Sequence, residues 1–211
     1  MVALKHRELE MANSTISTCP ADCDQAFPVR RFTVEEYHRL GASCVLADDD
    51  HVELLEGLIV PKMIRKPVHD AVVEMVREAI SRVLPGGWCI RGQSAITTSD
   101  SEPEPDIAVV LGTARDYLGH HPHPPEIALV VEVAETSLDR DRNKRRLYAR
   151  AGIACYWIIN IHAREVELYT KVTSEDEPKY EVEIVYVATS SIPLVIDGQQ
   201  IAHIPVADLL P

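Results

Sequence analysis

The chain has 211 residues, of which 21 are basic and 33 are acidic, so its formal net charge is −12. This acidic balance argues against broad, non-specific binding to nucleic acid, although it leaves room for a nucleic-acid enzyme with a local basic surface. Hydrophobic residues make up 46% of the chain, which is enough for a sizeable core. No apolar run approaches the ~20 residues that cross a bilayer, so we expect no membrane-spanning segment.

The N-terminal segment, residues 1–28, is rich in Ser, Thr, Asn and Asp and has no lasting apolar period. We expect it to be a flexible leader to a single domain over residues 29–211. Cys19 and Cys23 have the spacing CxxxC, but no second ligand pair is near, so a solvated leader is a better interpretation than a zinc site. Charges stand where an export signal needs apolar residues, and the five cysteines are mostly scattered, so the sequence favours a reducing cytoplasm.

Residue spacing predicts three helices and a hairpin. Thr33 and Glu36 have the spacing of a capping box at the start of the first helix. Apolar runs flank Glu56 and Gly57, which predicts a hairpin with these two residues at its turn. Pro67 can occupy the first turn of the second helix. The expected elements are a helix over 33–41, a hairpin over 52–60, and helices over 67–84 and 137–151.

The second half of the domain is rich in predicted strands. Residues 127–133, IALVVEV, form a nearly continuous apolar run with one charge, which is typical of a central strand buried on both faces. The other expected strands cover 88–98, 106–111, 155–161, 166–169, 180–187 and 194–196. We therefore expect an α/β domain in which a mixed β-sheet is flanked by helices.

Two carboxylates stand out against this framework. Asp106 follows a proline and directly precedes the apolar run IAVV, so it lies at the mouth of a buried strand. Glu132 is the one charge within IALVVEV, and a buried carboxylate has to be paired, protonated or bound to a metal because an unpaired one is costly. A structural ion pair is one alternative. Two carboxylates on adjacent strands also suit Mg²⁺, which lowers the pKa of a bound water.

A basic segment follows these acids over residues 140–150. On a helix, Lys144 shares a face with the apolar positions and Tyr148, whereas Arg145 and Arg146 point elsewhere. We expect Lys144 to point inward, where a cation can orient water or stabilise developing charge in phosphodiester hydrolysis. The alternative is a lysine whose stem simply follows the apolar face of an ordinary amphipathic helix.

Several stretches together resemble one known family. They are FTVEEYHRLG, VELLEGLIV, PVHDAVV, SEPEPDIAVV, LVVEVAETSLDRDRNKRRLYARAGI and CYWIIN, and they cover most of the chain from about residue 32 in the family's order. In these stretches the chain is similar to the Uma-two family, also catalogued as domain of unknown function 820, within the PD-(D/E)XK restriction-endonuclease-like superfamily. The resemblance implies a restriction-endonuclease-like fold and metal-dependent cleavage of DNA.

The resemblance also implies roles for individual residues. Asp106, with the proline before it, resembles the PD element, and Glu132 resembles the second acid, so that the two hold Mg²⁺ or, in its place, Mn²⁺. The position two residues on is Ala134, and the lysine of the pattern is matched instead by Lys144 on the following helix. Glu56 resembles the family's N-terminal acid, an additional ligand of metal or water, with a solvated turn acid as the alternative.

Five further residues are candidates for the site, and three of them, His69, Gln93 and Tyr148, have two interpretations each. His69 falls in a matching stretch, where it caps or packs the helix start or binds metal. Gln93 orients a ligand or satisfies a strand neighbour. Arg145 and Arg146 are expected to bind substrate. Tyr148, one turn beyond the inward lysine, either touches substrate or packs in the core.

Three functions remain in view. The first is a Mg²⁺-dependent DNA endonuclease, the second a non-catalytic nucleic-acid-binding or regulatory module on the same scaffold, and the third a hydrolase of another phosphate compound. The complete set of Asp106, Glu132 and Lys144 weighs against the second. Enzymes of this type commonly cut two strands by pairing two sites, and the late apolar run IPLVI can form a partner surface, so we expect a homodimer that acts on DNA.

Overall fold

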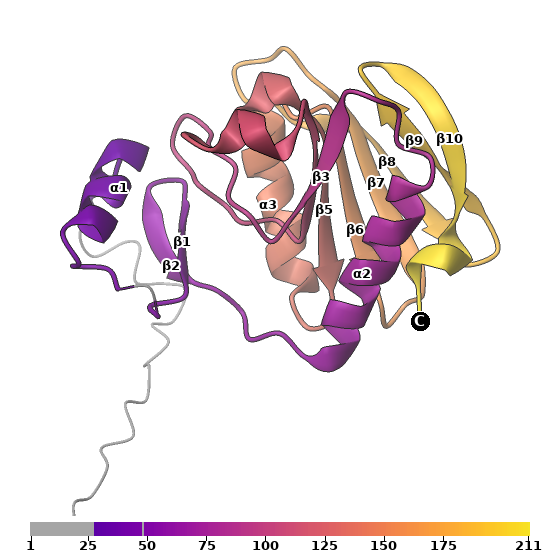
Figure 1. Ribbon diagram of the computed structural model, residues 1–211, viewed down its shortest axis with the longest axis horizontal. Helices are drawn as coiled ribbons and strands as arrows, with labels where there is room; N and C mark the ends of the chain where they lie inside the picture. Colours follow the sequence, from indigo (N-terminus) through magenta and orange to yellow (C-terminus); the bar gives the residue numbers. More distant parts are fainter. Residues whose placement is uncertain (1–27, 48) are drawn as a thin grey trace, which may run out of the picture. The chain divides into compact units, whose positions relative to one another are not determined.

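The computed structural model in Figure 1 describes residues 28–47 and 49–211. The expected leader over residues 1–28, with Cys19 and Cys23, lies outside the described residues except for its last position, and it stays a prediction. Residues 31–211 form one compact unit. In the described part of the chain, no helix combines the length and apolar character needed to cross a membrane.

A six-stranded mixed sheet in the order β3-β4-β5-β6-β7-β8 lies at the centre of this unit (Figure 1). Its strands are β3 (Trp88–Gly92), β4 (Ile107–Leu111), β5 (Ile127–Ala134), β6 (Cys155–Asn160), β7 (Glu165–Val172) and β8 (Tyr180–Val187). β5 and β6 run parallel, and the other neighbours run antiparallel. Parallel neighbours need a crossover connection, and α3 (Leu138–Arg150) supplies it.

The helices α2 (Pro67–Ser81) and α3 cover opposite faces of the sheet. Successive strand residues point to opposite faces, so each central strand contributes to both cores. Val131 of β5 belongs to one core with Val76 of α2, whereas Val130 belongs to the other with Leu147 of α3. From Val130 to Ala134, the even-numbered residues of β5 therefore face α3, whereas Ala128, before this stretch, packs in the core on the α2 side.

The predicted N-terminal elements are present. α1 (Val34–Ala42) begins at the expected capping box, in which the Glu36 amide donates to Thr33 Oγ1 and the Thr33 amide donates to Glu36 Oε2, both at 3.1 Å. β1 (Val52–Leu55) and β2 (Leu58–Pro61) form the expected hairpin. The short 3₁₀ helices are η2 (Ala114–Tyr117), η3 (Pro124–Glu126) and η4 (Val206–Leu209).

The hairpin turn requires its glycine. Glu56 and Gly57 have φ angles of 50° and 78°, which is the left-handed region that glycine adopts without strain. A Cβ at Gly57 would also lie 2.6 Å from the Cβ of Arg31. The turn therefore fixes where the Glu56 side chain can point.

The apolar run IPLVI does not form the partner surface expected from the sequence. It lies in β9 (Ser191–Ile196), which pairs with β10 (Gln199–Pro205) in a second hairpin. Ile192, Leu194 and Ile196 are at most 2% exposed and pack into the core on the α2 side of the sheet. This run is apolar because it covers the protein's own sheet.

Several element boundaries differ from expectation: β7 and β9 are longer than the expected strands over 166–169 and 194–196, whereas β3 and α2 are shorter than expected. The strand expected over 88–98 ends at Gly92, because Gln93 has a φ angle of 50° and turns the chain away from β4. The second helix ends at Ser81 rather than at residue 84, and Val68 in its first turn is 46% exposed.

Candidate active site

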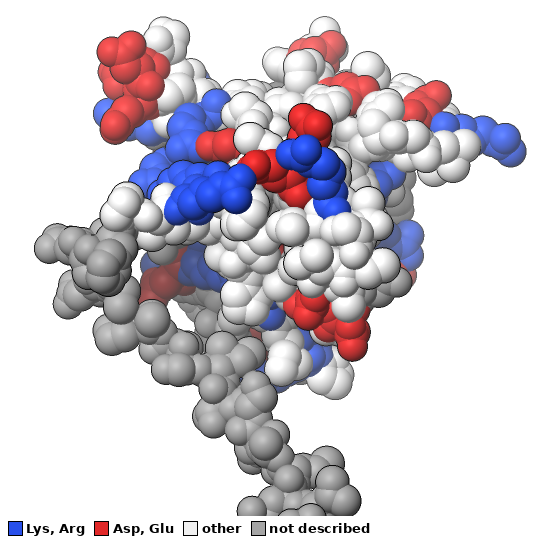
Figure 2. Space-filling view, turned by 90° about the vertical axis from the view of Figure 1, so that its left-hand side faces the viewer, with Lys and Arg blue, Asp and Glu red and all other residues white. Residues whose placement is uncertain are grey.

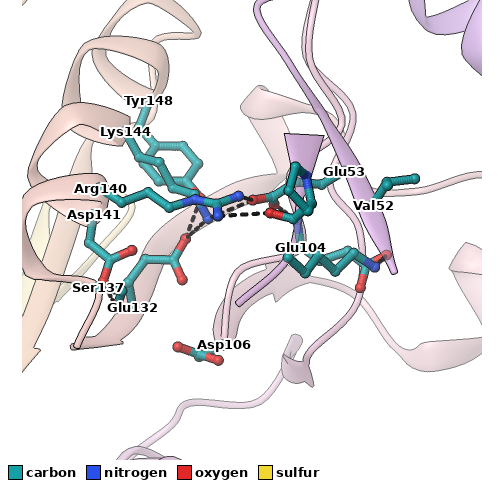
Figure 3. Close-up of polar contacts among 12 residues, drawn as sticks. Val52, Glu53, Glu104, Asp106, Glu132, Ser137, Arg140, Asp141, Lys144 and Tyr148 are labelled. Carbon is teal, nitrogen blue, oxygen red and sulfur yellow. Dashed lines mark hydrogen bonds and ion pairs between the residues drawn. The ribbon is translucent and has the colours of Figure 1, made fainter. Parts of the chain in front are cut away.

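Asp106 and Glu132 lie on adjacent strands and on the same face of the sheet. Ile107 pairs with Val131 in the β4–β5 register, so the antiparallel pairing brings Asp106 opposite Glu132. Strand alternation then turns both carboxylates toward α3. The two residues are only 6% and 4% exposed, and both line one cavity (Figure 3).

Helix α3 holds one oxygen of Glu132. Lys144 Nζ donates to Glu132 Oε1 at 2.9 Å, and the Tyr148 hydroxyl donates to the same oxygen at 2.8 Å. Lys144 and Tyr148 are four residues apart, so both point to the same side of the helix. Lys144 faces inward as predicted, and Tyr148 is fully buried in the core, so its hydroxyl positions Glu132 and is not exposed to a substrate.

The start of α2 holds Asp106. The Val133 amide donates to Asp106 Oδ2 at 2.8 Å, and His69 Nε2 lies 3.1 Å from the same oxygen. Burial lowers the pKa of His69, but the hydrogen bonds and charges of Asp106 and Asp70 outweigh burial and raise it. His69 thus packs at the helix start, which was one of its two sequence interpretations, and also positions a carboxylate of the cavity.

A third acid, Glu53 of β1, completes this arrangement and was missed in the sequence. Arg140 Nη2 donates to Glu53 Oε1 at 2.7 Å, and Lys144 Nζ lies 3.4 Å from the same oxygen. The Glu104 amide donates to Glu53 Oε2 at 3.2 Å. Figure 3 shows the Lys144 and Arg140 side chains reaching between β5 and β1. The sequence signal was available, because Glu53 is a lone charge in an apolar strand, as Glu132 is.

Acidic side chains outnumber basic ones in the buried part of the cavity. Asp141 of α3 is a further buried carboxylate, held by the Ser137 hydroxyl. The buried carboxylates that line the cavity are those of Glu53, Asp106, Glu132 and Asp141. Among the described residues, Lys144 and Arg140 are the Lys and Arg side chains that bind these carboxylates, and His69 binds Asp106. Lys62 and Arg65 also line the cavity, but at its exposed side, and Lys62 is paired with Glu104.

The pKa shifts follow from this imbalance. Burial raises the pKa of Glu132, Lys144 opposes the rise, and the charges of Asp141, Asp106 and Glu53 reinforce it. Burial also raises the pKa of Asp141, against the Ser137 hydrogen bond. Burial alone would lower the pKa of Lys144, but the carboxylates around it raise it instead. The lysine therefore keeps its positive charge, while burial and the neighbouring acids favour the protonated form of Glu132 as long as no further cation is bound.

This donor set fits a hard divalent cation. Within residues 28–47 and 49–211, no three or more His, Cys, Asp and Glu side chains come together in a way that would hold an ion by themselves. Mg²⁺, however, typically uses only one or two protein carboxylates and completes its octahedron with water or substrate oxygens. Asp106 and Glu132, two buried carboxyl groups that line one cavity, match that mode of binding.

Glu56 does not belong to this cavity, contrary to the expectation from the sequence. It lies at the hairpin turn, where Arg146 Nη2 donates to Oε2 at 2.6 Å and Arg150 Nη1 donates to Oε1 at 3.0 Å. The positive φ angles of the turn aim the side chain at the exposed face of α3 instead of its buried face. The acid that reaches the cavity from this hairpin is Glu53.

The expected substrate-binding arginines are also occupied elsewhere. Arg145 lies outside the cavity, with Nη1 3.4 Å from Glu183 Oε2 and its guanidinium over the Tyr169 ring. Arg146 is bound to Glu56. Figure 2 shows Lys and Arg atoms interleaved with Asp and Glu atoms on the face it presents, so that face has no continuous basic surface. Gln93 lines a second hollow. This hollow and the cavity share five lining residues: Lys62, Met63, Ile64, Arg65 and Glu104.

Comparison with known proteins places this chain in a family. Residues 34–205 match the model of the Uma2 family, which is described as "Putative restriction endonuclease". The chain belongs to the Uma2 family. The match includes every residue that lines the cavity of this Uma2 protein, from Glu53 to Lys144. No match was found among curated proteins.

One solved structure resembles this Uma2 protein, and the likeness extends over nearly the whole length of the solved chain. It is the crystal structure of "a putative nuclease belonging to DUF820" from Anabaena variabilis ATCC 29413, with a TM-score of 0.66 and 17% sequence identity. The likeness covers 84% of this chain and 97% of that chain. At this identity the likeness concerns the fold, and it confirms the predicted nuclease-like α/β architecture.

Proposed function

We propose that this Uma2 protein is a Mg²⁺-dependent endonuclease that hydrolyses DNA phosphodiester bonds, with Mn²⁺ able to replace Mg²⁺. The observation that carries the proposal is the placement of Asp106 and Glu132 opposite each other in one cavity, with the Lys144 ammonium bound to Glu132. Membership of a family described as "Putative restriction endonuclease" supports the same reaction class. Because a fold hosts many functions, the cavity chemistry is the stronger argument.

Each carboxylate keeps one oxygen for the ion. Asp106 Oδ2 and Glu132 Oε1 are taken up by protein donors, whereas Asp106 Oδ1 and Glu132 Oε2 have no hydrogen-bond partner among the described residues. These two oxygens would hold Mg²⁺. When bound, such an ion lowers the pKa of a water and polarises a phosphoryl oxygen.

Lys144 acts as the fixed cation of the site. Its ammonium is held by Glu132 and Glu53, so it is positioned before substrate arrives. A preorganised charge of this kind stabilises the negative charge that develops on a phosphate during attack and orients the attacking water. Arg140 supports the arrangement indirectly, because it shares Glu53 with Lys144.

A plasmid-nicking assay tests the proposal. We expect the wild-type protein to convert supercoiled plasmid to open-circular or linear DNA with Mg²⁺ or Mn²⁺, and to lose this activity in EDTA. Asp106→Asn and Glu132→Gln remove ligand charge with little change in volume, and we expect both to lose cleavage at least hundredfold.

Two glutamates serve as matched controls. Glu181→Gln changes an exposed residue of the edge strand β8, and Glu56→Gln changes the turn residue that lies outside the cavity. Both are expected to cleave at the wild-type rate. Loss of cleavage in Glu56→Gln with unchanged folding would contradict the placement of the site. DNA binding without cleavage by the wild-type protein in either metal would favour a non-catalytic module, and phosphate release from nucleotides alone would favour a different hydrolase.

We also propose a cytoplasmic location. Cys44, Cys89 and Cys155 are free thiols, a state that a reducing compartment maintains. Recovery of the native protein from an extracellular or periplasmic fraction would contradict this assignment.

A further inference from the structure

The segment between β2 and α2, residues 62–66 with the sequence KMIRK, forms a wall of the proposed active site. We call it the 62–66 loop. Its first four residues line both the cavity that contains Asp106 and the neighbouring hollow that contains Gln93. A molecule that extends from the cavity into this hollow therefore passes along the loop.

The loop presents apolar side chains to solvent. Ile64 is 92% exposed and Met63 is 51% exposed. A single exposed apolar residue is ordinary on a protein surface. These two are adjacent, however, and they line the acidic cavity, so burial against the protein's own core does not explain them.

Arg65 is the second unusual feature of the loop. Among the Lys and Arg side chains that line the cavity, the other three are each bound to a carboxylate: Lys62 to Glu104 at 2.6 Å, Arg140 to Glu53 at 2.7 Å and Lys144 to Glu132 at 2.9 Å. Within the described residues Arg65 has no such partner. Its charge is therefore available to an anion from outside the protein.

We propose that the 62–66 loop binds the DNA strand on which the site acts, with Arg65 on a backbone phosphate and Ile64 and Met63 against the sugar and base of an adjoining nucleotide. The guanidinium fork of arginine matches the geometry of a phosphate group, and apolar side chains complement the less polar faces of nucleotides. This inference rests on the proposed nuclease function.

The charge distribution favours this loop over helix α3. The exposed arginines of α3 are neutralised by Glu56 and Glu183, so binding DNA there would first require breaking those ion pairs. The net charge of −12 makes the general attraction of DNA weak, so DNA binding has to depend on a cation that is unpaired and lies near the cavity. Arg65 has no ion pair among the described residues and lines the cavity, so it meets both conditions.

Fluorescence anisotropy with a short labelled DNA duplex tests the inference separately from cleavage, because binding is measured with Ca²⁺ in place of Mg²⁺. We expect Arg65→Ala to weaken binding about tenfold, the effect of one charge-assisted hydrogen bond or slightly less. The slope of log Kd against log salt should fall by about 0.9, which corresponds to one phosphate contact.

Two further variants separate charge from apolar contact. Ile64→Ser should weaken binding about threefold with no change in the salt slope, because only apolar contact is lost. Arg115→Ala is the matched control for charge. Arg115 is exposed in η2, beyond the end of β4 that is remote from Asp106, and it has no ion pair within the described residues. It should change neither affinity nor slope.

The outcomes distinguish this inference from the proposed function. If wild type cleaves DNA but Arg65→Ala binds DNA normally, the loop assignment is overturned and the nuclease assignment stands. If wild type binds through Arg65 but does not cleave with Mg²⁺ or Mn²⁺, the loop assignment stands and the nuclease assignment fails. Wild type that binds no DNA also overturns the loop assignment. An Ile64→Ser variant that loses self-association while its DNA affinity is unchanged overturns it in favour of a protein contact.

Discussion

Lys144 is held between carboxylates from two different elements, Glu132 on β5 and Glu53 on β1. We expect Lys144→Met to lose cleavage about a hundred- to a thousandfold, or ~2.7–4 kcal/mol of transition-state stabilisation, by analogy with a lost oxyanion donor. It should also destabilise the fold by about 3–5 kcal/mol, because a broken buried ion pair leaves an uncompensated charge.

A double variant separates the two effects. Lys144→Met with Glu132→Gln removes the uncompensated charge, so it should unfold at a higher urea concentration than Lys144→Met while remaining inactive. Arg145→Ala, on the same helix but outside the cavity, should keep the wild-type cleavage rate at saturating DNA. Wild-type turnover by Lys144→Met would remove the lysine from the mechanism.

The residues that could be predicted are those whose orientation follows from a local period. Asp106, Glu132 and Lys144 each interrupt an apolar strand or helix pattern, and the period decides which face they take. The same rule applied to β1 identifies Glu53. The family resemblance pointed to Glu56 instead. What distinguishes Glu53 is its ion pair with Arg140, which lies 87 positions away in the chain, and no local pattern reports such a contact.

At the level of elements, α3 is the connection between the hairpin and the sheet. Arg146 and Arg150 bind Glu56 on one side, while Arg142 binds Glu167 of β7 on the other. The sequence showed a basic segment and could not show its partners, because these come from five separate stretches of chain. β10 was missed for a related reason, since its residues QQIAHIP are recognisable as a strand only when β9 lies beside them.

Glu167 gives this connection a defined pH dependence. Burial would raise the pKa of Glu167, but the hydrogen bonds from Arg142 and Tyr169, together with the charge of Arg142, lower it below its ordinary value. A carboxylate with a depressed folded-state pKa contributes stability above its unfolded-state pKa and loses it as the pH falls through the folded-state value. We therefore expect Glu167→Gln to destabilise the protein by ~1–3 kcal/mol at pH 7.

The difference between wild type and Glu167→Gln should shrink as the pH falls below about 4, the ordinary range of a glutamate. Urea unfolding at a series of pH values measures this difference directly. Glu181→Gln, which changes an exposed glutamate on the neighbouring strand, should show no comparable pH dependence. A Glu167→Gln effect that is constant between pH 7 and pH 3 would mean that packing, and not the charge, carries its contribution.

At the scale of the whole molecule, the order of elements and the mixed sheet could be predicted because hydrophobic periods and turn residues agree along most of the chain. The position of the cavity could not be predicted, since it depends on β1 lying close enough to α3 for Glu53 to contact Arg140 and Lys144. The leader expected over residues 1–28 lies outside the described residues except for Pro28, and it stays a prediction.

The homodimer is also a prediction about the whole molecule. The structure indicates a different contact surface for it than the one expected from the sequence. The run IPLVI is buried, whereas β8 is the last strand in the sheet order and pairs only with β7 among the described strands. Ile184, Val185 and Val187 of β8 are each more than 40% exposed. An edge strand with apolar side chains and unpaired backbone groups is a template for a second copy.

We expect light scattering to report about twice the 23.5 kDa of one chain at micromolar concentration. Val185→Lys places a charge on the proposed edge and should shift the mass to that of one chain, because a lysine on an exposed edge strand disfavours edge-to-edge pairing. Leu118→Lys changes an equally apolar exposed residue after η2 and should leave the dimer intact. If both variants remain dimeric, the second copy binds elsewhere. If wild type is monomeric while it linearises plasmid, one copy cuts both strands in successive encounters.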